Sequence, residues 1–343
     1  MKGIGRYLRV LIFLALGLLL LWWVTRGQDL DKIMEEFRNA NYFWIAMAMV
    51  AGIFSHVFRA VRWNILIRSL GYKVKLGNTF HAVMSGYLAN LVVPRLGEVS
   101  KCAVLSKSDG IPFNSLAGTM IAERFVDLIT LILLMFFTIA FQFHFLKDFL
   151  YDFFFGSLIE KGSSALLIFL LAGGAVLALA IGFLWWLRRR LREAKPDTFG
   201  YKLRRQLRGF GNGIKTLWRM RNKGWFLLYS LVIWGLYFLN AYLGFFAISA
   251  SSHLSPDAGI TLLAVGSLGI LAPVPGGIGT YHFITIATLT QLYNIAPEPA
   301  TSYAYITHAG QMLLIISTSV ILWFIFSIRK NGQVEQQEPG DVA

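Results

Sequence analysis

The chain has 343 residues, of which 56% are hydrophobic and only 15% are charged. This composition, with several apolar runs long enough to cross a bilayer, excludes a soluble globular domain and indicates a multi-pass membrane protein. The formal net charge of +14 comes from Lys and Arg in short segments beside those runs, a pattern that the positive-inside rule explains better than nucleic-acid binding does.

The N-terminal part of the chain predicts two membrane spans joined by an amphipathic helix. The apolar run at 8–24 follows a short basic start and is not followed by a small-residue cleavage site. We therefore expect an uncleaved signal anchor with a cytoplasmic N-terminus. An amphipathic helix over 29–41 should lie on the outer face, and a second span over 42–60 should return to the cytoplasm.

The next apolar region predicts a broken helix rather than a span. Residues 78–93 and 99–107 are separated by Pro94-Arg95-Leu96-Gly97-Glu98. Each piece is too short to cross about 30 Å of hydrocarbon at about 1.5 Å per residue. We expect a re-entrant hairpin that enters and leaves on the cytoplasmic side, followed by a long third span over 114–141.

The second half of the chain repeats this order. A span over 163–187 precedes the segment 188–223, which carries thirteen Lys and Arg and is expected to be a cytoplasmic loop that contacts anionic lipid head groups. A fifth span over 225–249 follows. The last expected span covers 302–327, and the polar tail at 329–343 is expected to be disordered.

A second broken helix lies between these last two spans. Two half-helices over 258–271 and 279–293 are interrupted by the run from Ile270 to His282, which contains Pro273, Pro275 and three glycines. Proline lacks an N–H and glycine lacks a Cβ, so this backbone cannot be helical throughout. Broken backbone at membrane depth is tolerated only inside protein or beside a wet cavity, which indicates a binding site.

The charges fix the expected topology. If the first broken segment crossed the membrane once, the basic segment 188–223 would face outside, against the positive-inside rule. The sequence therefore predicts an all-α polytopic membrane domain over 1–328, with about six full spans and two re-entrant broken helices in an inverted-topology pseudo-repeat. We expect the protein to lie in a bacterial inner membrane, with both termini in the cytoplasm.

The two breaks are the candidate binding site. The helix starts near Gly97 and Gly279 would point free N–H groups and positive dipole ends into a cavity, which favours an anion such as a lipid phosphate. Arg95 would contact the phosphate and Glu98 would hold or release it; alternatively, the two residues pair with each other and only staple the hairpin. Backbone donors of the second break are expected from Gly276, Gly277 and Gly279.

Other charged residues recur at helical spacing. Glu123 and Asp127 share one face of the third span with Arg124 nearby, so they form either a titrating gate or an ion-pair network that braces Arg95 or Arg62. His56, Arg59 and Arg62 are expected to snorkel to lipid head groups rather than to line a path. Three further residues could belong to the cavity as polar or titratable groups: His282, His308 and Gln311.

Catalytic and metal signatures are missing from the sequence. It contains no nucleophile elbow, zinc-protease motif or phosphate-binding P-loop, and its single cysteine excludes a cysteine-rich metal site. We therefore expect no enzyme activity, no cofactor and no metal.

Four motifs together resemble the transmembrane region of lysylphosphatidylglycerol synthases, a family of flippase-like membrane proteins, over about residues 8–328. They are Pro94-Arg95-Leu96-Gly97-Glu98, Glu123-Arg124-x-x-Asp127, Pro273-x-Pro275-Gly276-Gly277-Ile278-Gly279 and Arg59-x-x-Arg62-Trp63-x-x-Leu66 with Gly71. The resemblance implies a lipid flippase. The family's C-terminal synthase domain is not expected here, because the sequence ends at Ala343. At one motif position this chain has His282 where the family usually has Glu.

Three hypotheses follow from the sequence. The first is a flippase or transporter for a phosphate-bearing lipid, either an anionic phospholipid or an isoprenoid-linked lipid. The second is an intramembrane enzyme that modifies a lipid. The third is an accessory subunit that presents lipid to a separate lipid-synthesising enzyme without moving it.

Overall fold

The computed structural model describes residues 4–141, 182, 189, 220, 222–272 and 274–335, and the regular secondary structure within them is entirely helical. The chain divides into two compact units, one formed by Met1–Leu131 and Thr216–Ala343 and the other by Ile132–Lys215. All contacts discussed below lie within the first unit. The expected span over 163–187 and almost all of the basic segment 188–223 lie outside the described residues.

The first three helices follow the expected order. Helix α1 covers Ile4–Thr25, α2 covers Leu30–Asn39 and α3 covers Tyr42–Ser69. The side chain of Asp29 caps α2 by accepting the N–H groups of the first turn, which are otherwise unpaired at a helix start. Helix α3 continues well past the expected end at residue 60, so Arg59 and Arg62 lie inside a helix rather than at its end.

The first break is confirmed as two short helices joined by a turn. Helix α4 covers Leu76–Val92 and α5 covers Leu96–Asp109. Pro94 forces the residue before it into extended backbone, and Arg95 adopts a left-handed conformation with φ 63°. The two helices run antiparallel and touch at their glycines, since a Cβ on Gly86 would lie 2.8 Å from the carbonyl oxygen of Gly97.

Among the remaining helices, the last one differs most from its expected boundaries. Helix α14 begins at Pro297, because proline fits the first turn of a helix, and it continues to Glu335. Helix α14 thus includes residues 329–335 of the segment expected to be a tail, while 336–343 lie outside the described residues. The other bounds are α6 Phe113–Phe141, α11 Lys223–Phe245, α12 Pro256–Leu271, η3 Pro275–Gly277, α13 Thr280–Ala287 and a π-helical turn at Thr288–Leu292.

Three of the described helices are long and apolar enough to cross a membrane, judged by length and composition: Tyr42–Ser69, Lys223–Phe245 and Pro297–Ile328. Shorter apolar helices cover Phe13–Thr25 and Pro256–Ile270. The all-helical architecture with these apolar segments fits a polytopic membrane protein.

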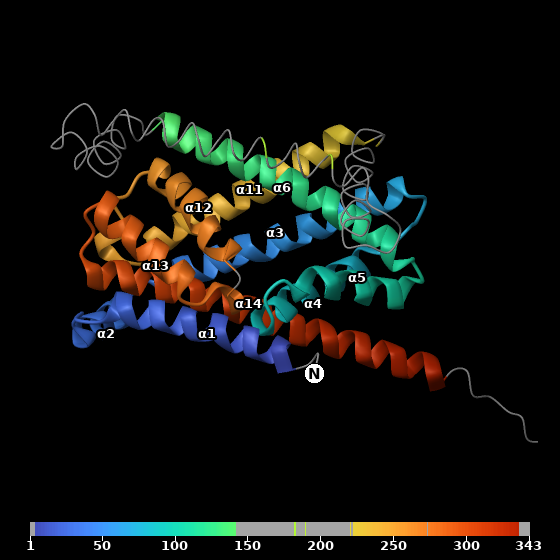
Figure 1. Ribbon diagram of the computed structural model, residues 1–343, viewed down its shortest axis with the longest axis horizontal. Helices are drawn as coiled ribbons and strands as arrows, with labels where there is room; N and C mark the ends of the chain where they lie inside the picture. The colour runs from blue at the N-terminus through green and yellow to red at the C-terminus, as the bar shows by residue number, and fades with distance from the viewer. Residues whose placement is uncertain are drawn as a thin grey trace, which may run out of the picture. The chain divides into compact units, whose positions relative to one another are not determined.

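Helices α3 and α11 run antiparallel along their whole length (Figure 1). Near the start of α3, Asn240 of α11 donates to the carbonyl of Ala48 at 2.6 Å, while near its end Arg62 donates to Ser230 at 3.0 Å. Helix α6 in turn runs antiparallel to α3, as their hydrogen bonds show. Helix α14 runs in the opposite direction to α11 (Figure 1). Helices α3 and α6 of the first half therefore have oppositely directed counterparts, α11 and α14, in the second.

The two broken hairpins approach each other from opposite ends of these helices. Helix α4 turns back along α3, with Thr79 bonded to Asn64 at 2.6 Å. Helix α12 turns back along α11, with Gly259 packed against Phe238 and Tyr242. The hairpin tips meet, because a Cβ on Gly276 would lie 3.1 Å from the side chain of Leu91 (Figure 1).

Candidate functional site

A buried network of five charged side chains joins three helices beside the first break. It consists of Arg59 and Arg62 on α3, Lys101 on α5, and Glu123 and Asp127 on α6, and each is at most 9% exposed. Glu123 Oε2 accepts from Lys101 Nζ at 2.7 Å, and Glu123 Oε1 accepts from Arg62 Nη2 at 3.1 Å. Asp127 lies 2.8 Å from Nη2 of Arg59 and 2.8 Å from Nη1 of Arg62.

Helical spacing explains how these groups meet. Arg59 and Arg62 lie three residues apart on one face of α3, and Glu123 and Asp127 lie four apart on one face of α6. Antiparallel docking turns these two faces toward each other. Charges removed from solvent must be paired, because an unpaired buried ion is far more costly than a paired one.

Aromatic and hydroxyl side chains complete the surroundings of the network. Arg59 donates to the hydroxyl of Tyr87 at 2.9 Å, and Lys101 Nζ lies 4.5 Å from the ring centroid of Trp63. Trp63 donates its indole N–H to Thr119 on α6 at 2.9 Å. These contacts hold the cations in fixed positions between α3, α4 and α6.

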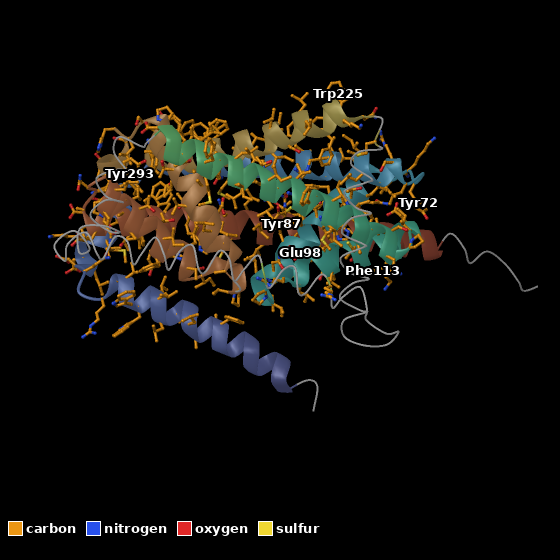
Figure 2. The ribbon with its side chains drawn as sticks, turned by 45° about the horizontal axis from the view of Figure 1, so that its top comes forward. Tyr72, Tyr87, Glu98, Phe113, Trp225 and Tyr293 are labelled. Atoms are coloured by element: carbon orange, nitrogen blue, oxygen red, sulfur yellow. The ribbon has the colours of Figure 1, made fainter. Side chains whose placement is uncertain are left out.

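A second ion pair lies at a more open position. Arg124 Nη2 is 3.2 Å from Glu98 Oε1, and their side chains are 41% and 25% exposed. A small cavity of about 20 Å³ lies between this pair and the buried network, lined by Arg59, Val83, Gly86, Tyr87, Asn90, Gly97, Glu98, Lys101 and Arg124. Figure 2 shows Tyr87 and Glu98 close together, far from Tyr72 and Tyr293.

A second polar cluster surrounds the other break. His308 on α14 makes a 2.9 Å hydrogen bond to the carbonyl of Gly276 and stacks on Tyr281. The rings of His282 and His308 lie 4.7 Å apart between centroids. The structure therefore brings His282 and His308 together at the tip of the second hairpin.

The structure places some predicted residues differently. The Gly97 N–H donates to Asn90 Oδ1 at 2.7 Å, and the Gly279 N–H donates to His282 Nδ1 at 3.3 Å. Both amides were expected to be free, and both are already hydrogen-bonded. Gly277 likewise donates to the carbonyl of Val274. These donors are used inside the hairpins, because a broken backbone must satisfy its own polar groups.

Arg95 is also not where the sequence suggested. Its side chain is exposed and does not pair with Glu98, which pairs with Arg124 instead. The prediction of an Arg95–Glu98 staple is wrong, since the left-handed turn directs Arg95 away from α5's first turn. The expected snorkelling of Arg59 and Arg62 is wrong too, because both guanidinium groups are buried against Glu123 and Asp127. Of the alternative, the predicted ion-pair network, Glu123 and Asp127 do pair with Arg62, whereas Arg124 pairs with Glu98.

Two contributors were missed at the sequence level. Lys101 follows Glu98 by one helical turn, and this spacing could have indicated a second charge on the same face of the helix. The second is Asn240 on α11, whose Oδ1 accepts a hydrogen bond from Gln311 at 2.7 Å. Gln311, a predicted cavity residue, lines a separate small cavity together with Asn240 and does not line the charged cavity. Among the described residues, no group of three or more His, Cys, Asp or Glu could hold a metal ion.

Comparison with known proteins gives the family. The model of the lysylphosphatidylglycerol synthase transmembrane region matches residues 9–319, and the chain therefore belongs to this family. It is 24% identical to a UPF0104 membrane protein of Pyrococcus horikoshii over 82% of this chain and 86% of that one. It is also 24% identical to a UPF0104 membrane protein of Methanocaldococcus jannaschii over 85% of this chain and 87% of that one.

A partial likeness involves a larger protein. The glycosyltransferase AglD of Haloferax volcanii is 29% identical over 37% of this chain, which corresponds to 21% of AglD. No solved structure matches the chain.

Proposed function

We propose that this protein transports a phosphate-bearing lipid between the leaflets of a cytoplasmic membrane. The observation that carries the proposal is the cavity lined by Arg59, Lys101 and Arg124 beside the tip of the first hairpin. Buried cations at membrane depth are costly and are kept where they serve a ligand or an ion path. A lipid phosphate is the anion that a membrane supplies to such a cavity.

The opposed hairpins support a transport role rather than simple anchoring. In this proposal α4–α5 and α12–α13 are re-entrant, and about six helices span the membrane with both termini in the cytoplasm. The first hairpin then opens from the inside and the second from the outside. Alternating separation of each hairpin from its long helices would expose the head-group cavity to one leaflet at a time.

The pair Arg124–Glu98 is suited to act as a gate. It joins the hairpin helix α5 to α6 at the open side of the cavity, and its partial exposure means that breaking it costs little, about 1 kcal/mol or less. The buried contacts of Glu123 instead hold α3, α5 and α6 together. In this scheme a head group competes for Arg124, releases Glu98 and lets the hairpin move.

The experiment is leaflet-resolved translocation of a fluorescent short-chain phosphatidylglycerol in proteoliposomes. Wild type and Lys107→Gln should translocate at equal rates, because Lys107 is exposed on α5 and does not line the cavity. Lys101→Gln should slow translocation at least tenfold, and Arg124→Gln provides a second variant at a less buried position. Wild-type rates in both cavity variants, or no wild-type translocation above empty vesicles, would refute the proposal.

The likeness to part of a protein named a glycosyltransferase gives a second candidate, a lipid-modifying enzyme. The likeness covers only 21% of that protein, so it gives the lipid-modifying enzyme less support than the charged cavity gives the transporter. Incubation of the purified protein with labelled lipids, followed by mass spectrometry of the products, separates the two. A new covalent lipid product would favour the enzyme; translocation of unmodified lipid favours the transporter.

A further inference from the structure

The charged cavity has hydrogen-bonding groups that nothing in the described part of the chain satisfies. The Nε–H groups of Arg59 and Arg124 and the Oε2 atom of Glu98 are buried atoms without a hydrogen-bond partner. All three residues line the same cavity. Arg59 is only 5% exposed, and its Nε lies 3.7 Å from Glu123, too far for a hydrogen bond. A buried polar group without a partner is costly, so these atoms indicate a ligand.

The kinds of unsatisfied atom describe that ligand. Two cationic donors require an acceptor such as a phosphate oxygen, since arginine recognises phosphate well. The free carboxylate oxygen of Glu98 requires a donor, which a hydroxyl or an ammonium group on the same head group can supply. The ligand should therefore combine a phosphate with a hydrogen-bond donor.

The charge balance restricts the ligand further. The network and the adjacent ion pair together contain four cations and three carboxylates. The cations are Arg59, Arg62, Lys101 and Arg124, and the carboxylates are Glu98, Glu123 and Asp127. One positive charge is left over. A ligand with one negative charge neutralises the site, whereas a doubly negative or a positive one leaves charge buried without compensation.

Building on the proposed transport function, we propose that this cavity selects a lipid head group of single negative charge: a monoanionic phosphodiester with a hydrogen-bond donor. It discriminates against diphosphate head groups and against aminoacylated head groups of net positive charge. The cavity of about 20 Å³ has room for little more than a water molecule, so the pair Arg124–Glu98 must separate to admit the head group, while the acyl or isoprenoid chains remain in the bilayer.

The test is competition for binding to the full-length protein in detergent. Fluorescent short-chain phosphatidylglycerol is the probe, and the competitors are phosphatidylglycerol, phosphatidylglycerol phosphate, lysyl-phosphatidylglycerol and soluble glycerophosphoglycerol. We expect phosphatidylglycerol to compete at least tenfold better than the more negative and the positive lipid. Glycerophosphoglycerol, which has the head group without chains, should compete weakly; equal competition would assign the site to a free phosphodiester and overturn the lipid part of the proposal.

Variants that change the net charge of the site test the charge balance directly. Glu98→Gln raises the excess to two positive charges and should shift preference at least tenfold toward phosphatidylglycerol phosphate. Lys101→Gln removes the excess and should weaken the preference for phosphatidylglycerol, while Lys107→Gln should leave it unchanged. If Lys101→Gln fails to fold, Glu98→Gln alone still decides, because Glu98 is partly exposed. An unchanged preference in Glu98→Gln overturns the proposal.

Translocation measured on the same preparations keeps the two proposals apart. If wild type translocates all of these lipids at similar rates and binds them alike, the charge selection is wrong and transport stands. If wild type shows the expected binding preference without translocating any lipid, the head-group site stands and transport is wrong.

Discussion

Replacement of Glu123 by glutamine should destabilise the protein more than any other single charge removal in the network. Glu123 is fully buried and contacts three cations, Lys101 at 2.7 Å, Arg62 at 3.1 Å and Arg59 at 3.7 Å. Without its carboxylate, Asp127 still pairs with Arg59 and Arg62, but Lys101 loses the carboxylate that it contacts. Removal of one partner from a buried ion pair typically costs about 3–5 kcal/mol, because the remaining charge is left uncompensated.

The control is Glu98→Gln, which removes a carboxylate with one partly exposed partner. Its expected cost is about 1 kcal/mol or less, since solvent screens both side chains. The double variant Glu123→Gln with Lys101→Gln removes one charge of each sign. Its cost should fall below the sum of the two single costs by at least about 1 kcal/mol, as expected for groups in direct contact.

The assay is equilibrium unfolding in mixed micelles, followed by circular dichroism. A Glu123→Gln cost no larger than that of Glu98→Gln would refute the argument that burial makes this network essential. Additive costs in the double variant would contradict a direct interaction between Lys101 and Glu123.

Three further predictions concern other parts of the fold. Gly279→Ala should cost at least about 2 kcal/mol in the same unfolding assay, because φ is 84° and the new Cβ would collide with the Gly17 carbonyl. The control Gly118→Ala should be neutral or stabilising, because the space around Gly118 is open. Thr119→Val should cost about 1–3 kcal/mol by leaving the buried indole N–H of Trp63 unpaired; an unchanged midpoint would exclude that role. Cysteines introduced at the exposed positions Lys73 and His253 should react with an impermeant thiol reagent from opposite sides of the membrane. Labelling of both from the same side would contradict opposed hairpins. The native Cys102 is buried and should give little background.

Local sequence determined the helices and the breaks. Apolar runs, the Pro94 turn and the glycines from Gly276 to Gly279 act through backbone sterics and hydropathy, which depend on near neighbours. For this reason α4, α5, α12 and the start of α13 fall close to their expected bounds. The spacing of Glu123 and Asp127 also predicted a shared face.

Only the tertiary structure decided which charges meet. Arg95 and Glu98 are close in sequence, yet Glu98 pairs with Arg124, and Lys101 rather than Arg95 joins Glu123. The reason is that a helix presents each side chain in one direction, and partners are chosen by how α3, α5 and α6 dock. Once these helices exclude solvent, every buried charge requires an opposite charge within reach, and this requirement acts across the fold rather than along the chain.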